Sequence, residues 1–111
     1  MSDSIDKILN EFIKKVKDLL GDRVKKIILY GSYARGDYNK NSDVDLMILT
    51  DLNPEEIEKY RDEISDIAFD IELDNGVVIS PVIKNIDKYN ARINIVPFYK
   101  NVQREGVVLN G

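Results

Sequence analysis

The amino-acid sequence predicts an α/β (α+β) protein with a small mixed or antiparallel sheet and helices mainly on one face of it. Three observations carry this prediction: two long stretches with apolar residues at helical spacing, three short runs of strand-forming residues, and the alternation of these two kinds of segment along the chain. The expected order is helix, strand, strand, helix, strand and a short final helix. Because no repeat, low-complexity tract or linker divides the 111 residues, we expect a single domain over residues 1–111.

The two long helices are marked by their periodicity and by their ends. Residues 4–20 carry apolar side chains three or four positions apart, and the glycine that follows is placed to end that helix. A second helix is expected after Asn53, which serves as an N-cap, with Pro54 in the first turn and Glu56 completing a capping box. The apolar pattern of this helix continues to Leu73.

Three runs of β-branched and apolar residues are expected to form strands. They cover residues 24–30 ("VKKIILY"), 44–49 ("VDLMIL") and 77–83 ("VVISPVI"). Pro81 has no N–H to donate to a ladder, so the third strand is expected at a sheet edge or at a bulge. The tail "PFYKNVQREGVVLNG" is expected to hold a short helix that Gly106 ends, followed by a last apolar stub.

Composition restricts the kinds of site that this chain can carry. A formal net charge of −4 argues against broad binding to nucleic acids, because neutralising phosphates requires a basic face. The chain has no cysteine and no histidine, so a bound metal must be held by oxygen, which favours Mg²⁺ or Mn²⁺. No apolar run is long enough to span a membrane, and the first residues, "MSDSIDKILN", lack the regions of a signal peptide. The expected location is the cytoplasm.

Asp43 and Asp45 are the strongest candidates for a metal site. Side chains alternate between the two faces of a strand, so these two carboxylates should project to one side with Cα atoms about 6.5–7 Å apart, while Val44 enters the core. Two acids in this arrangement repel each other, and a divalent cation relieves the repulsion. An EF-hand loop does not fit this segment, because its glycine and closing glutamate are not at the required spacing.

Gly31 and Ser32 are the candidates for a nucleotide-binding turn. The glycine lets the backbone come close to a ligand, and the serine offers a hydroxyl and an N–H to a phosphate. No lysine of a Walker motif follows them. Ten residues, 33 to 42, separate Ser32 from Asp43, which is enough for one turn of helix and a return into an antiparallel strand. Arg35 lies in this segment and is a further candidate for contact with phosphate.

A family resemblance extends this interpretation. The segment "GSYARGDYNKNSDVDL" resembles the Gly-Ser, ten-residue gap, Asp-x-Asp signature of the DNA polymerase β-like nucleotidyltransferases, and the chain is similar to their minimal branch. The tail "PFYKNVQREGVVL" is similar to the endings of such proteins. The resemblance implies a nucleotidyltransferase-like fold, a nucleoside triphosphate donor, expected to be ATP, and Mg²⁺. It assigns Gly31 and Ser32 to the nucleotide loop, and Asp43 and Asp45 to catalysis as metal ligands.

The resemblance also implies a reaction and a partner. Many minimal members are similar to the antitoxin half of two-gene modules, whose helical HEPN partner is a ribonuclease toxin silenced by adenylylation of a tyrosine. We therefore expect Mg²⁺-dependent transfer of AMP from ATP to a hydroxyl group of a small helical HEPN-type protein. The oligomeric state stays open.

The family usually completes its site with a third acid on a later strand, and here the sequence departs from the pattern. The run 77–83 offers Ser80 and no carboxylate. Asp70, Glu72 and Asp74 lie just before this run, in the predicted helix and its end. Either that helix ends early and "FDIEL" supplies the acid from a strand, or the site is incomplete.

An incomplete site leaves alternatives to protein adenylylation. One is a catalytically degenerate module that binds a nucleotide or covers a toxin without chemistry. Another is transfer to an antibiotic or another small hydroxyl compound, which is less favoured because no second domain is present to shape that pocket.

Overall fold

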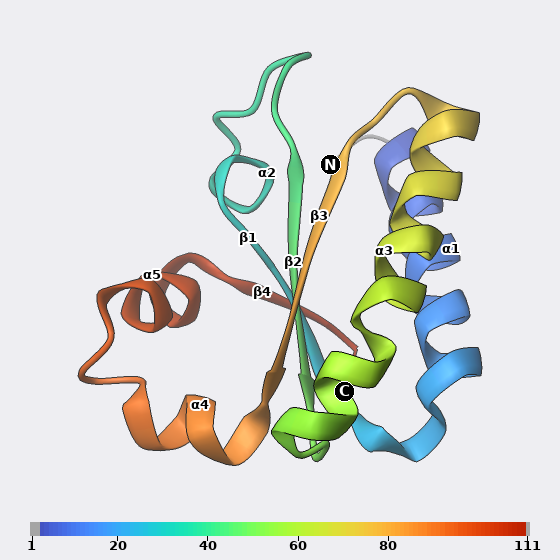
Figure 1. Ribbon diagram of the computed structural model, residues 1–111. Helices are drawn as coiled ribbons and strands as arrows, with labels where there is room; N and C mark the ends of the chain where they lie inside the picture. The colour runs from blue at the N-terminus through green and yellow to red at the C-terminus, as the bar shows by residue number, and fades with distance from the viewer. Residues whose placement is uncertain (1–2, 111) are drawn as a thin grey trace.

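A four-stranded mixed sheet forms the centre of the protein, and the computed structural model describes residues 3–110 of it (Figure 1). The strands are β1 (Val24–Tyr30), β2 (Val44–Thr50), β3 (Ile79–Asn85) and β4 (Val107–Asn110), in the order β3-β2-β1-β4. β1 pairs antiparallel with β2 and with β4, and β2 pairs parallel with β3. The predicted α/β class and mixed sheet are confirmed.

The two long helices cover one face of the sheet, and two shorter helices lie on the other (Figure 1). α1 (Asp3–Leu20) and α3 (Pro54–Asn75) pack over the larger apolar core. α4 (Ile86–Arg92) and α5 (Pro97–Glu105) cover a smaller cluster. The buried members of the smaller cluster are Ile28, Met47, Leu49, Tyr89 and Val102. The helical layer is therefore thicker on one face, as predicted, while the second face is covered as well.

β2 lies between two strands and is buried on both faces. Leu46 and Ile48 belong to the larger core, and Met47 and Leu49 to the smaller one. This double burial explains why the run reads as continuously apolar rather than alternating. Asp45, near the start of the strand, is only half-buried.

Several predicted element ends agree with the structure. The Asn53 side chain accepts a hydrogen bond from the Glu56 N–H, and the Glu56 carboxylate accepts one from the Asn53 N–H, which is the predicted capping box. β3 is an edge strand, so Pro81 sits where a proline is tolerated. The start of β3 differs from the prediction, because the strand begins at Ile79, two residues later than expected.

Three elements were not predicted, the first being a 3-10 helix, η1 (Gly21–Arg23), that follows α1 directly. α4 has only seven residues, and its start is capped by the Asn85 side chain, which accepts a hydrogen bond from the Lys88 N–H. The last apolar stub forms β4, which pairs with β1. Of the helices within residues 3–110, none combines the length and the apolarity that a membrane span requires.

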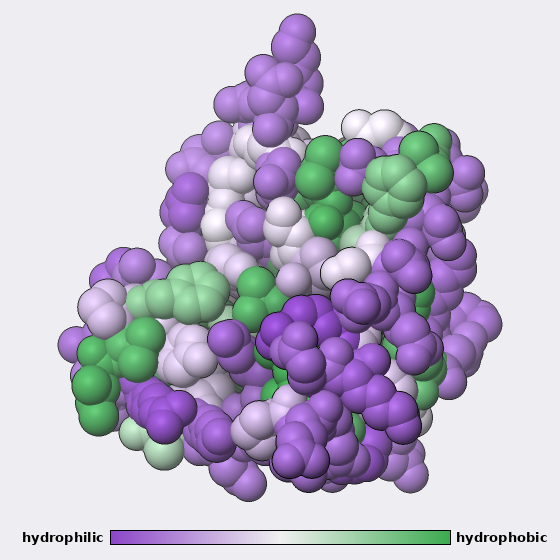
Figure 2. Space-filling model, viewed as in Figure 1, coloured by the Kyte–Doolittle hydropathy of each residue, from purple (hydrophilic) through white to green (hydrophobic). Residues whose placement is uncertain are grey.

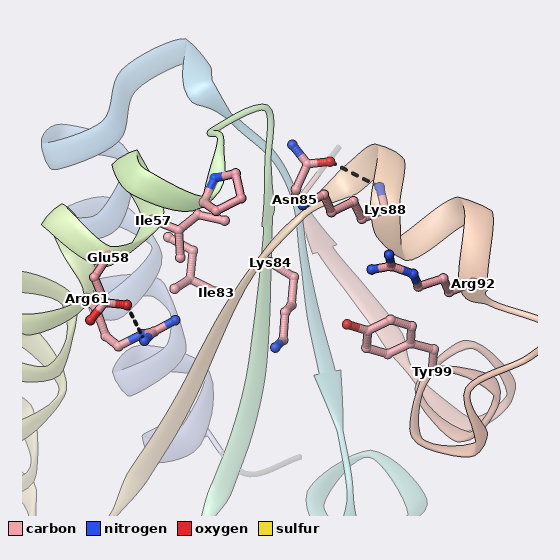
Figure 3. Close-up of a pocket in the computed structure, with 10 residues that line it drawn as sticks. Ile57, Glu58, Arg61, Ile83, Lys84, Asn85, Lys88, Arg92 and Tyr99 are labelled. Atoms are coloured by element: carbon pink, nitrogen blue, oxygen red, sulfur yellow. Dashed lines mark hydrogen bonds and ion pairs between the residues drawn. The ribbon is translucent and has the colours of Figure 1, made fainter.

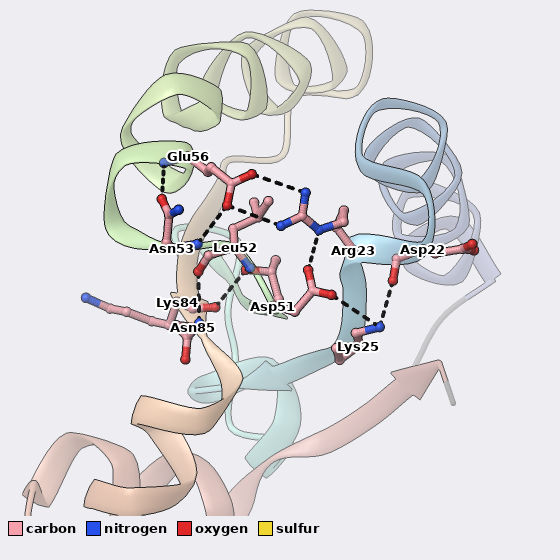
Figure 4. Close-up of polar contacts among 10 residues, drawn as sticks. Asp22, Arg23, Lys25, Asp51, Leu52, Asn53, Glu56, Lys84 and Asn85 are labelled. Carbon is pink, nitrogen blue, oxygen red and sulfur yellow. Dashed lines mark hydrogen bonds and ion pairs between the residues drawn. The ribbon is translucent and has the colours of Figure 1, made fainter.

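A charged cluster ties together the start of β1, the end of β2 and the start of α3 (Figure 4). Arg23 donates hydrogen bonds to Asp51 and to both carboxylate oxygens of Glu56, and Lys25 lies 3.6 Å from Asp51. Hydrogen bonds from Arg23 hold the pKa of Asp51 and the pKa of Glu56 below their ordinary values. One guanidinium thus connects three elements of the fold.

This cluster makes stability depend on pH. The pKa values of Asp51 and Glu56 are lower in the folded than in the unfolded chain, so their stabilisation is complete above the ordinary values of 3.8 and 4.5 and is lost as the pH falls below them. We expect Arg23→Gln to lower the free energy of unfolding at neutral pH and to flatten its decline in acid. Urea unfolding of both proteins across this pH range measures the effect.

The control is Lys14→Gln. Lys14 forms an exposed ion pair with Asp18, one turn away on α1, and such pairs contribute little. If Arg23→Gln and the parent protein lose stability in parallel on acidification, the cluster is not the source of the pH dependence.

Candidate functional site

The Gly31–Ser32 turn lies against the two aspartates because of the pairing between β1 and β2. Tyr30, the last residue of β1, is paired with Asp45 near the start of β2. The chain then turns at Gly31 into the single-turn helix α2 (Ser32–Arg35) and returns to β2. The predicted turn of helix and the antiparallel return are both confirmed. In Figure 1 this region is at the upper end of the sheet.

Gly31 is required at its position for two independent reasons. Its φ of 76° with ψ of −156° belongs to a region that residues with a side chain avoid. A Cβ added there would overlap the Asp45 Oδ2 atom and would lie 3.2 Å from Asp45 Cγ. The glycine therefore lets the backbone touch the carboxylate directly.

The two aspartates flank a buried valine, as strand alternation predicts. Val44 is fully buried, Asp43 is exposed and Asp45 is half-buried. Ser80, the parallel partner of Asp45 on β3, donates a hydrogen bond of 3.3 Å to Asp43 Oδ2. The carboxylates of the pair therefore face the same region, next to the Gly-Ser turn.

The surroundings of Asp45 disfavour its negative charge. Burial raises the pKa of Asp45, the charges of Asp43 and Glu105 raise it further, and Arg35 acts in the opposite direction. The carboxylate affects its strand partner in turn: burial and the charge of Asp45 raise the pKa of Tyr30 to about 12. The repulsion expected from the pair of acids is thus present in the structure.

Glu105, at the end of α5, is part of this site and was not predicted. Its Oε1 atom accepts a hydrogen bond of 3.2 Å from the Gly31 N–H, although the two residues are 74 positions apart. Both of its carboxylate oxygens accept hydrogen bonds from Arg35, and its side chain is only 19% exposed. Glu105 therefore braces the turn. The only signal for it in the sequence is its place in the tail that resembles family endings.

Arg35 is positioned by two acids. Its guanidinium forms ion pairs of 3.1 Å with Asp37 and with Glu105, and hydrogen bonds to both raise its pKa. The two carboxylates engage its Nε and Nη1 atoms, which leaves Nη2 for a ligand, so contact between Arg35 and a phosphate stays a prediction.

No third carboxylate joins the pair as a possible metal ligand within residues 3–110: Glu105 lies nearby but is bound to Arg35 and to the Gly31 N–H. Asp70, Glu72 and Asp74 all belong to α3, so the alternative in which "FDIEL" forms a strand is wrong. Within residues 3–110, no three acids come together as a group that could hold a metal ion. The neighbouring position on β3 is occupied by Ser80, whose hydroxyl is bound to Asp43.

Comparisons with known sequences agree with this geometry. The sequence model of the nucleotidyltransferase domain family matches residues 9–105. A protein from Methanocaldococcus jannaschii, provisionally named a protein adenylyltransferase, is 38% identical over 104 residues, which are 94% of this chain and 96% of that protein. A second protein of that organism with the same kind of name is 43% identical over 79 residues, covering 71% of this chain and 78% of its own length.

Solved structures show the same fold. A crystal structure from Sulfolobus solfataricus, described provisionally as a nucleotidyltransferase, has a TM-score of 0.57 and 16% identity, and covers 97% of this chain and 86% of its own. A crystal structure of a toxin–antitoxin with AMP-PNP has a TM-score of 0.55 and 19% identity, and covers 90% of this chain and 71% of its own.

Gly31→Ala tests the contact between the turn and the acid pair. The backbone conformation alone should cost about 1–3 kcal/mol, and the overlap with Asp45 adds to this, so we expect a loss of stability together with loss of nucleotidyl transfer. Gly36→Ala is the matched control: Gly36 also has a positive φ, of 86°, but nothing lies within 4 Å of an added Cβ. Urea unfolding and a transfer assay on both variants make the comparison. Equal behaviour of the two would rule out a special role for the contact with Asp45.

Asp45→Asn should make the protein more stable in the absence of metal. The amide keeps the shape of the carboxylate and removes a charge that burial and the neighbouring acids disfavour, so we expect the melting temperature to rise by about 1–4 °C at neutral pH. Thermal unfolding in EDTA measures this. A fall of the melting temperature instead would mean that the charge of Asp45 is stabilised by contacts other than those described here.

Proposed function

Because the chain belongs to the nucleotidyltransferase domain family, we propose that it transfers AMP from ATP to a hydroxyl group of a partner protein in a Mg²⁺-dependent reaction. The observation that carries this proposal is the direct contact between the Gly31 backbone and the Asp45 carboxylate. This contact brings a turn suited to phosphates and a pair of acids suited to a cation into one site. We further propose that residues 1–111 act as one domain, because one continuous sheet includes all four strands.

The Gly-Ser turn supplies donors for the phosphates. The N–H groups of Ser32 and Tyr33 come first in α2, where no earlier carbonyl of the helix can accept their hydrogen bonds. The Ser32 hydroxyl forms no hydrogen bond with any residue of the described range 3–110. We expect these groups to hold the terminal phosphates of ATP and thereby to orient the α-phosphorus for attack.

The donor set fits a hard divalent cation. Asp43 and Asp45 offer carboxylate oxygens, and a cation would relieve the burial and the neighbouring negative charges that raise the pKa of Asp45. Two carboxylates together with substrate phosphates are a common way to bind Mg²⁺. When bound, the ion would supply Lewis-acid stabilisation of charge on the phosphates.

The transfer requires a hydroxyl that gives up its proton without a strong base nearby. The acceptor oxygen forms a bond to the α-phosphorus and its proton passes to water, while the bond from the α-phosphorus to the β-phosphate breaks and pyrophosphate leaves. A phenol, with a pKa of about 10, ionises more readily than an aliphatic alcohol. Among residues 3–110 the site has no third acid in the metal-ligand group, and Glu105 is bound to Arg35 and to the Gly31 N–H, so it is better matched to a tyrosine acceptor.

The nature of the partner rests on similarity. The relatives carry the provisional name of protein adenylyltransferases, and structural neighbours come from toxin–antitoxin complexes. We propose a small helical HEPN-type protein as the acceptor and the antitoxin role for this chain, in the cytoplasm.

A second candidate is a binding module that covers its partner without chemistry. The observation in its favour is the serine on β3 at the position beside Asp45, where no acid is available. Calorimetry separates the two candidates. An affinity for the partner that is unchanged by ATP and by Asp43→Asn, combined with no transfer, supports the covering role.

Transfer of label from ATP tests the leading candidate. We expect the purified protein, with labelled ATP, Mg²⁺ and the product of the adjacent gene, to label that product on tyrosine. Asp43→Asn and Asp45→Asn should reduce labelling to background, and EDTA should do the same.

The matched control is Asp70→Asn. Asp70 is an exposed acid on α3, so this variant makes the same chemical change outside the site and should keep full transfer. Loss of transfer in this variant would identify Asp70 as the missing third acid and contradict the two-carboxylate site. Absence of label with every protein, the unmodified one included, would remove the enzymatic proposal for this partner.

A further inference from the structure

A second site is suggested by a cavity of about 270 Å³ at the opposite end of the sheet (Figure 3). It lies between the first half of α3, the end of β3, α4 and α5. β2 and β3 are parallel and are joined through α3, so the cavity is at their carboxyl ends, where ligands of α/β proteins commonly bind. The acid pair, in contrast, is near the amino end of β2.

The lining of the cavity is strongly cationic. Arg61 comes from α3, Lys84 from β3, and Lys88 and Arg92 from α4, against a single carboxylate, Glu58. The cavity therefore carries three net positive charges on a chain whose formal net charge is −4. Figure 2 shows hydrophilic side chains crowded over the lower centre and right of this face of the molecule, with hydrophobic ones at the lower left.

Three of these four cations have no ion pair within the described residues. The one acid in the lining is hydrogen-bonded to Arg61, at 2.6 Å from its Nη1 atom. Lys84, Lys88 and Arg92 form no ion pair with any residue of the range 3–110. Lys88 and Arg92 are also one helical turn apart, where like charges repel. An anion in the cavity would relieve this repulsion.

The remaining walls suit a small ligand with a carbon portion. Ile57 and Ile83 contribute apolar surface, and the Tyr99 hydroxyl and the Arg92 guanidinium point toward the space between α3 and α4 (Figure 3). A volume of about 270 Å³ is just below the usual range for sites of drug-sized ligands. The convergence of donors from four elements on one hollow favours a compact anion over an extended chain.

We propose that this cavity binds a small phosphorylated molecule, with the phosphate among Lys84, Lys88 and Arg92. The site is separate from the nucleotidyl-transfer site. On β3, Ser80 lies beside Asp45, and Lys84 is four residues further along the strand, a distance of about 13 Å. The site does not depend on whether the acid pair is catalytic.

Chemical-shift mapping by NMR tests this proposal, because it reports which residues respond. Inorganic phosphate and glycerol 3-phosphate are titrated separately, in EDTA, into the uniformly ¹⁵N-labelled protein. We expect saturable shifts of the amides of Lys84, Lys88 and Arg92 with little change at Ser32. Tighter binding of the ester would identify a phosphate ester that uses the apolar wall, and equal binding would identify free phosphate.

The double variant Lys88→Gln/Arg92→Gln removes two exposed charges from the cavity without touching buried side chains, and should weaken binding at least tenfold. Lys7→Gln/Lys17→Gln, on α1, makes the same change in net charge elsewhere and should bind like the parent. Non-saturable shifts, shifts confined to residues 32–36, or equal weakening by both double variants would overturn the proposal. The proposal would also be overturned if shifts at the cavity appeared only with an acidic peptide of the partner and with neither phosphate compound.

Discussion

The contact between the Gly31 backbone and the Asp45 carboxylate is the constraint on which the site depends. It follows from the pairing of Tyr30 with Asp45, which places the turn after β1 directly against the start of β2. Strand alternation then directs Asp43 to the same region and buries Val44. Glu105 adds a brace from α5 by accepting the Gly31 N–H. A small shift in the register between β1 and β2 would separate the Gly31 turn from the two aspartates.

Apolar side chains fill the middle of the sheet, and polar side chains lie at its two ends. β2 is buried on both faces through its middle, where no polar group could be placed without a partner. Polar groups therefore gather at its ends: the acid pair at one, and at the other the Arg23 cluster and the cationic cavity beyond β3. The acid pair and the cationic hollow differ in sign, while the Arg23 cluster contains charges of both signs. This division allows one short chain to present two chemically distinct surfaces.

Sequence reasoning succeeded where the signals are local. The capping box at Asn53, the Gly-Ser turn and the alternation around Val44 are each written within a few neighbouring residues, and the structure has all three. Sequence reasoning failed for features that depend on contacts between distant parts of the chain. α4 has seven residues, too few for a clear helical period, and the pairing of β4 depends on a distant strand. The role of Glu105 is also non-local, because its partner is 74 residues away.

Glu105 also has a consequence for the order of events during synthesis. A ribosome makes the chain from its amino end, so the turn and both aspartates emerge well before α5 and β4 exist. Until then the Gly31 N–H lacks its carboxylate partner, Arg35 has Asp37 but not Glu105, and β1 has a free edge where β4 will pair. The Gly31–Ser32 turn therefore reaches its braced geometry only after Glu105 has been added. A nascent chain truncated before Glu105 would present the motif without the support that holds it in place.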